Sequence, residues 1–543
     1  MEAMKRDLAA LRSALSAGDY TAANRAADRL RNEADTAHGL TTGPAWWVAS
    51  NLPWAGEPLR TQRVLAAAGD SLASRAIPGV LELAKNLDGS TVRKGDSIDL
   101  DVLRRAAPVL ARAVDSTRGA IAAVQGTASG TWLGPADDAR RAVIDSLEAI
   151  AGQLDGASNT VDTALPMLGG DGLRRYFVGF MNEAEARGLG GLPGGFAIVT
   201  ADRGKITFDH FGNDTELDGI KADVDLGADF DNRYGPLDPT GTFVNSDVSP
   251  HFPYAAQIWA SMWQKKTGQH IDGAIAVDPT ALSYLLKVTG PTRLADGTTV
   301  DSGSVIALLQ QGQYARYADD ADRDRFVLAI ADAVADKVTS GNGPPKDLVR
   351  MLGKAARERR LVMWSTRPAE QNALVAAGYA GVIGGNGRPL SGFTVTNAAG
   401  SKLDYYLDRS MSYTRKSCDA GSPVTATLTL TNRAPTKGLP AYVVLRADKP
   451  DHAVMPGDNR MQVSYYATPG ATIKALTLDG KAIPFASVTE AGNVVVSLMV
   501  ELPVGSTRTI EVRLRDPEAG AVQLLRQPLV RAQTESVDAP SCS

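Results

Sequence analysis

The sequence holds only two cysteines, Cys418 and Cys542, and this scarcity limits the metal sites that it can form. Two cysteines cannot supply the thiolates of a four-ligand zinc site, and their spacing matches no zinc finger. Two alternatives remain: buried free thiols, or one disulfide that ties the polar C-terminal tail to its domain. We favour the disulfide, which would place the protein outside the reducing cytosol.

An excess of basic residues and a long apolar run are also missing. Lysine and arginine total 57 against 61 aspartates and glutamates. The chain therefore lacks the basic footprint of a sequence-independent nucleic-acid binder. No run of about 18 apolar residues occurs, so the sequence predicts no membrane span. The opening residues, MEAMKRDLAAL, also lack the layout of a signal peptide.

The common motifs of hydrolases and nucleotide-binding proteins are absent as well. There is no Gly-x-Ser-x-Gly elbow and no His-Glu-x-x-His, and the five histidines are scattered. The glycine-rich stretch NEAEARGLGGLPGGF, residues 182–196, leads into a predicted β-hairpin. Phosphate-binding loops lead into a helix instead, so this stretch is neither a P-loop nor a dinucleotide fingerprint. We expect Gly194 and Gly195 to let the backbone turn tightly into the strand FAIVT.

The 543 residues divide into three regions that differ in the spacing of their apolar and polar residues, and these predict a multidomain α+β protein. Residues 1–170 show helical spacing of apolar residues and predict hairpins or a bundle that acts as a stalk or scaffold. Residues 171–400 mix strands and helices and predict an α/β domain. Residues 401–543 alternate apolar and polar residues, as in VTATLTLTN and TIEVRLR, and predict an Ig-like β-sandwich.

Two clusters of charge in the middle region are candidates for ligand binding. The stretch DVDLGADFDN offers four aspartates, which are either solvated loop acids or ligands of a divalent ion bound with a phosphate. The stretch QYARYADDADRDRF brings Arg316, Arg323 and Arg325 together in sequence. Their guanidinium groups suit a pyrophosphate, although the neighbouring aspartates offer a salt-bridged surface as the alternative.

Several segments resemble a known family. NEAEARGLGGLPGGFAIVTADRGKI, HIDGAIAVDPTALSYLLKVTGP, QYARYADDADRDRFVLAIADAV and KLDYYLDRSMSY are similar, in this order, to the DUF 4012 domain-of-unknown-function family of bacterial envelope proteins. The resemblance covers nearly the whole chain. It implies an extracytoplasmic protein of the cell envelope, anchored in the membrane by an N-terminal helix that this chain lacks.

The central segment also resembles, more distantly, the LytR-CpsA-Psr (LCP) family, which moves glycopolymers from a polyprenyl-pyrophosphate carrier onto peptidoglycan. The tyrosine-alanine-arginine motif beginning at Tyr314 carries this resemblance. It implies an LCP-like fold and a pyrophosphate held by Arg187, Arg316, Arg323 and Arg325, with Mg²⁺ as a possible cofactor. Glu185 or Asp247 would be the base for the acceptor hydroxyl.

The sequence departs from that second pattern in two places. GNDTELDG lacks the expected arginine after KITFDHF, and Phe326 replaces a glutamine. Two functions therefore remain open. The first is a phosphotransferase that passes a polyprenyl-linked glycan to a cell-wall acceptor, and the second is a non-catalytic envelope protein that binds the glycan or its lipid carrier. A cell-wall polymer or an envelope protein is the expected partner in either case.

Overall fold

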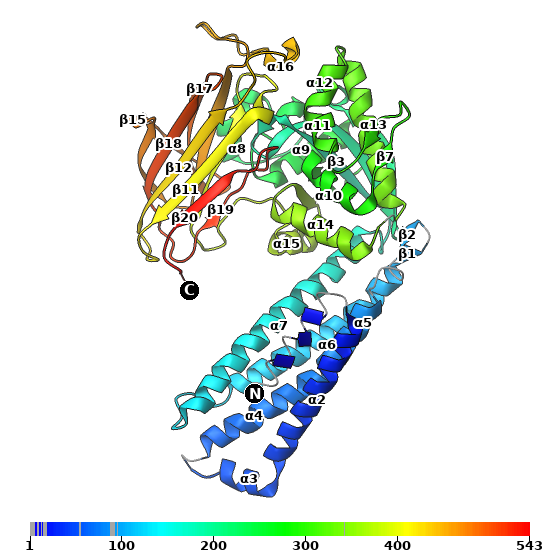
Figure 1. Cartoon of the computed structure of the whole chain (residues 1–543), viewed down its shortest axis with the longest axis vertical. Helices are drawn as coiled ribbons and strands as arrows, with labels where there is room; N and C mark the ends of the chain where they lie inside the picture. Colours follow the sequence, from blue (N-terminus) through cyan, green and yellow to red (C-terminus); the bar gives the residue numbers. More distant parts are fainter. Residues whose placement is uncertain are drawn as a thin grey trace. The chain divides into compact units, whose positions relative to one another are not determined.

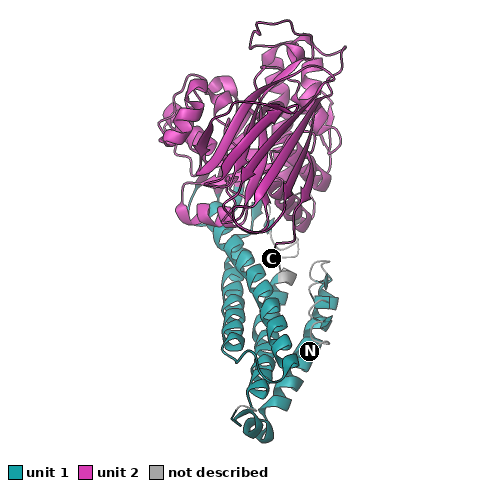
Figure 2. Ribbon diagram, turned by 90° about the vertical axis from the view of Figure 1, so that its left-hand side faces the viewer, with its two compact units in different colours: residues 1–173, 202–205 teal, residues 174–201, 206–543 magenta. Residues whose placement is uncertain are grey.

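The computed structural model describes residues 6–7, 10–11, 13–14, 19–53, 56–86, 93–94, 96–341 and 343–542. The chain forms two compact units (Figure 2), residues 1–173 with 202–205 and residues 174–201 with 206–543. Within the described ranges, no helix is both long enough and apolar enough to cross a bilayer.

The first unit is helical, as predicted (Figure 1). Its two longest helices, α6 (Leu100–Gln125) and α7 (Gly134–Met167), pack against each other through Leu110, Val114 and Leu154. Asp99 starts α6 because its carboxylate accepts a hydrogen bond from the Asp101 backbone N–H. The remaining elements are α2 (Tyr20–Thr42), α3 (Pro44–Ser50), α4 (Glu57–Ser71), the π-helix η1 (Leu72–Ala76), α5 (Ile77–Asn86), β1 (Arg93–Lys94) and β2 (Ser97–Ile98).

The second unit begins with a mixed sheet in the order β5 (Lys205–Asn213), β4 (Gly190–Asp202), β3 (Arg174–Arg187), β6 (Gly273–Val277) and β9 (Leu361–Ser365). Strands β3 and β6 are parallel, whereas β4 and β9 run antiparallel to their neighbours β3 and β6. The predicted hairpin of β4 and β5 is confirmed, and its turn places Arg203 and Gly204 at positive φ.

Helices complete this α/β region and bury an aromatic core. Phe177 of β3 stacks on Phe196 of β4, and Trp259 of α9 packs over Phe177. Gly179 allows this approach, because a Cβ there would lie 2.7 Å from the Trp259 ring. The helices are α8 (Ala228–Tyr234), α9 (Phe252–Thr267), α10 (Pro279–Thr289), α11 (Val305–Ala307), η5 (Leu308–Gly312), α12 (Gln313–Arg316), α13 (Asp320–Thr339), α14 (Pro345–Arg357) and α15 (Pro368–Ala376), with β7 (Thr292–Arg293) and β8 (Thr299–Val300) between them.

The β-sandwich is confirmed as two facing sheets whose alternating residues build one core. One sheet has the order β16 (Ser487–Glu490), β17 (Asn493–Leu502), β13 (Asn459–Ala467), β10 (Leu390–Asn397) and β19 (Gln523–Leu524). The other has the order β15 (Lys481–Ala482), β14 (Thr472–Leu478), β18 (Thr507–Arg515), β12 (Pro423–Asn432), β11 (Leu407–Arg415) and β20 (Thr534–Asp538). We expected the sandwich to span residues 401–543, and the structure adds β10, which precedes residue 401.

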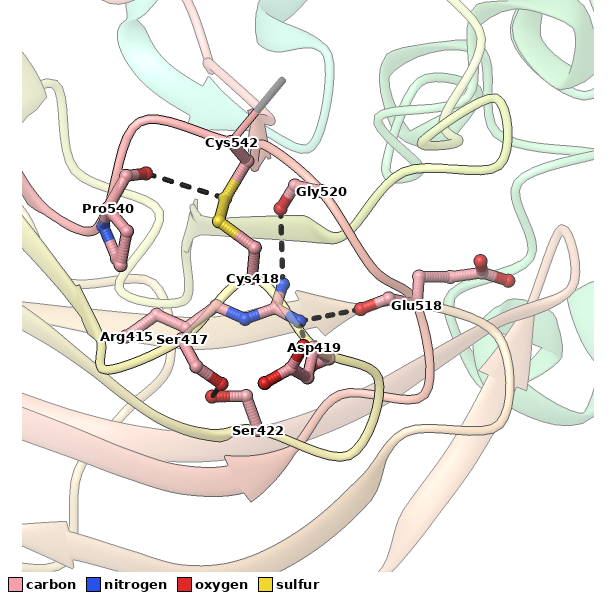
Figure 3. Close-up of a disulfide and its surroundings, with 9 residues drawn as sticks. All are labelled: Arg415, Ser417, Cys418, Asp419, Ser422, Glu518, Gly520, Pro540 and Cys542. Carbon is pink, nitrogen blue, oxygen red and sulfur yellow. Dashed lines mark hydrogen bonds between the residues drawn. A yellow bond between two sulfur atoms is a disulfide. The ribbon is translucent and has the colours of Figure 1, made fainter.

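The two cysteines form a disulfide, with Cα atoms 5.6 Å apart (Figure 3). Arg415 lies beside it and donates hydrogen bonds to the backbone carbonyls of Asp419 and Glu518, both at 2.7 Å. The C-terminal tail is thus held to the sandwich covalently, next to strand β20, which pairs with β11. A disulfide of this kind is typical of proteins outside the cytosol.

A buried polar network joins the sandwich to the α/β region within the second unit. Glu490 of β16 is fully buried, and one of its carboxylate oxygens accepts hydrogen bonds from the hydroxyls of Tyr234 and Tyr466, at 2.9 and 2.8 Å. The Arg233 guanidinium lies 3.0 Å from the same oxygen. Tyr234 and Arg233 belong to α8, so this carboxylate fixes a helix of the α/β region to the sandwich.

Candidate functional site

The candidate site is built on irregular pairing between β3 and β4. Asn182 pairs with Leu192 and Ala186 pairs with Gly191, so residues 183–185 have no partner in β4. One backbone group of this unpaired stretch binds a side chain that is distant in sequence. The Ala184 N–H donates to the Gln310 side-chain oxygen at 2.6 Å. This β-bulge redirects the acidic side chains of Glu183 and Glu185.

The turn before β4 corrects one expectation. Gly194 and Gly195 do not form the tight turn; both lie in β4, and the chain reverses at residues 188–189 instead. Gly194 is the extra residue of a smaller bulge, because Phe180 pairs with Gly195 and Met181 with Pro193. The sequence alone shows the glycines but not which of them lies opposite β3.

Gly188 is the glycine that the fold requires most at this turn. A Cβ there would lie 2.1 Å from the Val248 carbonyl oxygen, whereas a Cβ at Gly194 would lie 3.8 Å from its nearest neighbour. We expect Gly188→Ala to lower the free energy of unfolding by about 1–3 kcal/mol and Gly194→Ala to have little effect. Urea unfolding of both variants measures this, and equal stabilities of the two would contradict it.

Glu183 lies in a buried charged cluster beneath the sheet. Its carboxylate is 3.0 Å from the Arg360 guanidinium, which also contacts Asp278 at 2.7 Å. Burial, and then the Asp278 charge, raise the pKa of Glu183 well above its ordinary value. Arg360 is thus the cation between two buried carboxylates.

Glu185 points toward a different pair of cations. It lies 3.1 Å from Arg187, and it forms an ion pair with Lys402, which follows β10. All three side chains are largely buried. The charge of the Glu185 carboxylate is therefore balanced by one cation from the α/β sheet and one from the chain that follows β10 of the sandwich.

A cavity of about 360 Å³ opens beside this bulge, and we refer to it as the bulge cavity. Most of its apolar wall comes from β3, β4, β6, α10 and α13. Its polar wall comes mainly from the bulge, residues 213–215, η5, α12, α13 and two residues of the sandwich region. The apolar lining is Phe180, Met181, Leu192, Val244, Val277, Pro279, Leu282, Leu309, Val327 and Leu328. The polar lining is Asn182, Glu185, Asn213, Asp214, Thr215, Asp278, Gln310, Gln313, Tyr314, Asp320, Arg323, Asp324, Lys402 and Tyr442.

Tyr442, in the sandwich helix α16 (Ala441–Val444), brings two cations together at the cavity. The Arg323 guanidinium lies 4.2 Å from the centre of the Tyr442 ring, and the Lys402 ammonium 5.4 Å from it. Both distances are those of cation–π contacts. Because 42% of Tyr442 is exposed, part of its ring remains open to a ligand.

The structure does not bring the four predicted pyrophosphate arginines together. Of the four, Arg323 lines the bulge cavity, and its guanidinium donates to the carbonyls of Tyr317 and Ala318. Arg187 is buried against Glu185 behind the cavity wall. Arg316 and Arg325 are exposed, with Arg316 bound to the Thr298 hydroxyl and Arg325 paired with Asp322.

A break in the helix explains why the arginines diverge. Helix α12 ends at Arg316, and Tyr317 is extended, with φ −124° and ψ 123°. Helix α13 then begins anew, with Asp319 as its N-cap. Arg316 and Arg323 therefore lie on different helices, and their sequence separation does not place them on one face.

Asp247, the second predicted base, is fully buried and does not line the cavity. Among the described residues, neither of its carboxylate oxygens has a hydrogen-bond partner. Burial raises the pKa of Asp247 well above its ordinary value, although the nearby Arg187 opposes this shift. The geometry thus favours a protonated, neutral acid.

This burial makes Asp247 a pH-dependent cost to stability. A carboxyl whose pKa is raised by folding does not lower the free energy of unfolding at pH values below its unfolded pKa of about 4. The free energy of unfolding then falls as the pH rises from that value toward the folded pKa. We expect Asp247→Asn to stabilise the protein by about 1–3 kcal/mol at pH 7 and to have no effect near pH 4. Denaturant titrations at the two pH values measure the difference.

Asp404 provides the matched control for that variant. It is equally buried, but its oxygens accept hydrogen bonds from Ala186, Asn397 and Asn459 at 2.7–2.8 Å. Asp404→Asn is expected to destabilise the protein, because its amide group would face these donors. Destabilisation by Asp247→Asn at pH 7 would mean instead that Asp247 is an ionised partner of Arg187.

Several residues of the cavity wall were not predicted from the sequence. Lys402 opens the quoted segment KLDYYLDRSMSY, but only the fold brings it to Glu185. No sequence motif pointed to Tyr442 or Gln310. Asn182 was visible as the first residue of the glycine-rich stretch, and it donates to the Tyr314 hydroxyl at 2.8 Å.

Three solved structures are similar to part of the chain. They are the Lin1025 protein from Listeria innocua (14% identity), a protein from Bacillus subtilis described as the transcriptional regulator YvhJ (11%), and B. subtilis TagV (12%). Each match covers 38–39% of this chain and 76–80% of the other, with a TM-score of 0.19. No curated protein matches the sequence.

One family model matches the segment that contains β3, β4 and the bulge. It is described as "Protein of unknown function (DUF4012)", and it matches residues 171–314. This confirms the family resemblance for residues 171–314, whereas the resemblance over the rest of the chain lies outside the match. The chain thus carries the DUF4012 family segment over residues 171–314, from the start of the α/β sheet to Tyr314 on the wall of the bulge cavity.

Proposed function

We propose that this chain is an extracytoplasmic envelope protein whose bulge cavity binds a glycan without transferring it. The observation that carries the proposal is the composition of the cavity wall. Asn182, Gln310 and Gln313 line the cavity together with carboxylates, apolar side chains and Tyr442, and the side-chain nitrogen of Gln310 is buried without a hydrogen-bond partner among the described residues. Sugars need this combination, because their hydroxyls both donate and accept hydrogen bonds while their ring faces pack on apolar surface.

The charge of the cavity wall argues against a pyrophosphate bound by arginines alone. The polar lining contains the carboxyl groups of Glu185, Asp214, Asp278, Asp320 and Asp324, but only two cations, Arg323 and Lys402. Each cation is already paired with a carboxylate of the same wall, Arg323 with Asp320 and Lys402 with Glu185. Asp278 is paired with Arg360, so among the described ion pairs Asp214 and Asp324 are the lining carboxyls without a cation, and their charge would oppose a bare pyrophosphate.

The two predicted bases also support binding rather than transfer. A general base needs a free carboxylate within reach of the acceptor hydroxyl. Glu185 is held between Arg187 and Lys402, and Asp247 lies outside the cavity wall. A non-catalytic binder requires neither of these groups to react.

A second candidate function, binding of a phosphate-bearing lipid carrier with Mg²⁺, is favoured by Asp214 and Asp324. Burial, and then the Asp324 charge, raise the pKa of Asp214, which shows that the two carboxyls lie close enough to interact. The described residues form no cluster of three or more metal-binding side chains. Two carboxylates nevertheless fit Mg²⁺ when the ligand's phosphate supplies further oxygens. The ion would then offset the charge between the wall and the phosphate.

Isothermal titration calorimetry with two soluble probes separates these functions. The first probe is the peptidoglycan disaccharide of N-acetylglucosamine and N-acetylmuramic acid, and the second is geranyl pyrophosphate with or without MgCl₂. We expect the disaccharide to bind, and Tyr442→Ala to weaken it by about tenfold, which corresponds to the loss of about 1.4 kcal/mol. Phe485→Ala, an exposed aromatic outside the cavity, is the matched control.

Binding of geranyl pyrophosphate without binding of the disaccharide would overturn the glycan proposal. Geranyl pyrophosphate binding only with Mg²⁺, and lost in Asp324→Asn, would support the carrier-binding function instead. Release of inorganic phosphate from this probe would indicate the phosphotransferase that the sequence resemblance implies. A chain that binds neither probe would contradict both proposals for the cavity.

A further inference from the structure

One end of the helical unit carries nearly all of that unit's exposed large apolar side chains. Among its described residues, these are Leu40, Trp47, Val48, Leu52 and Trp132, with Leu173 as the remaining one. Trp47 is 57% exposed and Trp132 is 64% exposed. We call the first five residues the apolar end. Large apolar side chains that gather on an exposed surface in this way commonly mark an interaction site.

The apolar end combines two segments that are far apart in the sequence. Leu40 to Leu52 span the end of α2, helix α3 and the chain after it, while Trp132 lies between α6 and α7. The middle of α4 packs with the end of α6 and the start of α7, through Leu65, Val124 and Ala139. Both segments therefore lie at the same end of this unit, as Figure 1 shows for α3 and the α6–α7 connection.

Both segments lack ionisable groups altogether. Residues 39–56 and residues 119–136 contain no aspartate, glutamate, lysine, arginine or histidine. The flanking helical surface is different, because the exposed Arg118 and Asp138 border the second segment. Arg60 of α4 and Arg140 of α7 also reach the two segments, where they donate hydrogen bonds to the carbonyls of Ser50 and Gln125. The boundary between charged and uncharged surface thus runs across the helical unit near this end.

The local structure holds the tryptophans outward. The Trp46 indole N–H donates to the Leu59 carbonyl of α4 at 3.2 Å, which fixes helix α3 against α4. With Trp46 half-buried in this way, the next two residues, Trp47 and Val48, point to solvent. The exposure of Trp47 is therefore a consequence of how α3 is docked.

We propose that the apolar end inserts into the interfacial region of a lipid bilayer. Tryptophan is enriched at this depth, where its ring is buried and its indole N–H still reaches polar groups. The absence of charge matches the neutral boundary between headgroups and acyl chains, since any ionised group there would cost free energy.

Binding of the full-length chain to vesicles of pure phosphatidylcholine tests this proposal. We expect co-sedimentation with the vesicles, a blue shift of tryptophan emission, and quenching by brominated acyl chains. The double variant Trp47→Ala/Trp132→Ala is expected to lower the partition coefficient by roughly tenfold or more, because two aromatic rings are lost. Leu52→Asp should act in the same direction by adding a charge.

Val349→Ala is the matched control, because Val349 is an exposed apolar residue on α14 of the other unit. It is expected to leave vesicle binding unchanged. Circular dichroism melts of all variants report whether the exposed substitutions preserve the fold.

Three results would overturn the proposal. One is no binding to phosphatidylcholine at any lipid concentration. Another is binding to anionic vesicles alone that the tryptophan substitutions do not change. The third is a self-associated chain in gel filtration that the double variant converts to monomer, since a second copy would then cover the apolar end.

Discussion

Arg360→Met is expected to lower the free energy of unfolding by about 3–5 kcal/mol at pH 7. The substitution leaves Glu183 and Asp278, which are both buried, without the cation that lies 3.0 and 2.7 Å from them. It also removes the hydrogen bond from Arg360 to the Leu529 carbonyl at 3.0 Å. Urea unfolding followed by far-ultraviolet circular dichroism measures the loss.

Two further variants show whether charge causes that loss. Arg350→Met removes an exposed arginine that pairs with Asp347 on α14, and exposed pairs of this kind contribute less than about 1 kcal/mol. Adding Glu183→Gln to Arg360→Met removes one of the two uncompensated carboxylates, so we expect the double variant to recover part of the stability. A double variant no more stable than Arg360→Met would point to lost packing instead.

Glu490→Ala is expected to have an effect of similar size, about 3–5 kcal/mol. Four groups lose their carboxylate partner at once: the hydroxyls of Tyr234, Tyr466 and Ser249, and the Arg233 guanidinium, which keeps its hydrogen bonds to the hydroxyls of Ser464 and Ser497. Each buried donor left unpaired carries a desolvation cost. Because Arg233 and Tyr234 lie on α8, we expect hydrogen exchange to increase first in α8 and β16.

Glu511→Ala is the matched control, since Glu511 pairs with the exposed Arg513 on strand β18. We expect it to change stability by less than about 1 kcal/mol. The double variant Arg233→Met/Glu490→Gln removes both charges and should be more stable than Glu490→Ala. Equal losses for Glu490→Ala and Glu511→Ala would show that the network does not fix α8 to the sandwich.

The elements that the sequence predicted well are those specified by local patterns. Strand β12 alternates along PVTATLTLTN, and every second side chain is buried in the sandwich core. Helix α13 begins where Asp319 caps it and contains five alanines, the residue with the highest helix propensity. Such features depend on neighbours in sequence, so one chain suffices to predict them.

The candidate site depends on partners that no local pattern specifies. The bulge at residues 183–185 is stabilised by Gln310, which is 126 residues from Ala184. Lys402 reaches the cavity from the chain after β10, and Tyr442 reaches it from the sandwich helix α16. The spacing of the arginines was misleading, because it suggested that Arg316 and Arg323 share one side of a helix. The extended residue Tyr317 instead separates two helices.

The disulfide between Cys418 and Cys542 also determines how the sandwich would respond to a mechanical load. Strands β12 to β20 all lie within the covalent loop that it closes. A force applied between β10 and the C-terminal tail could extend only residues 390–418, a length of roughly 100 Å. After reduction, the same force could extend the chain by more than about 500 Å. The bond therefore limits the extension of this sandwich under tension, whichever strand gives way first.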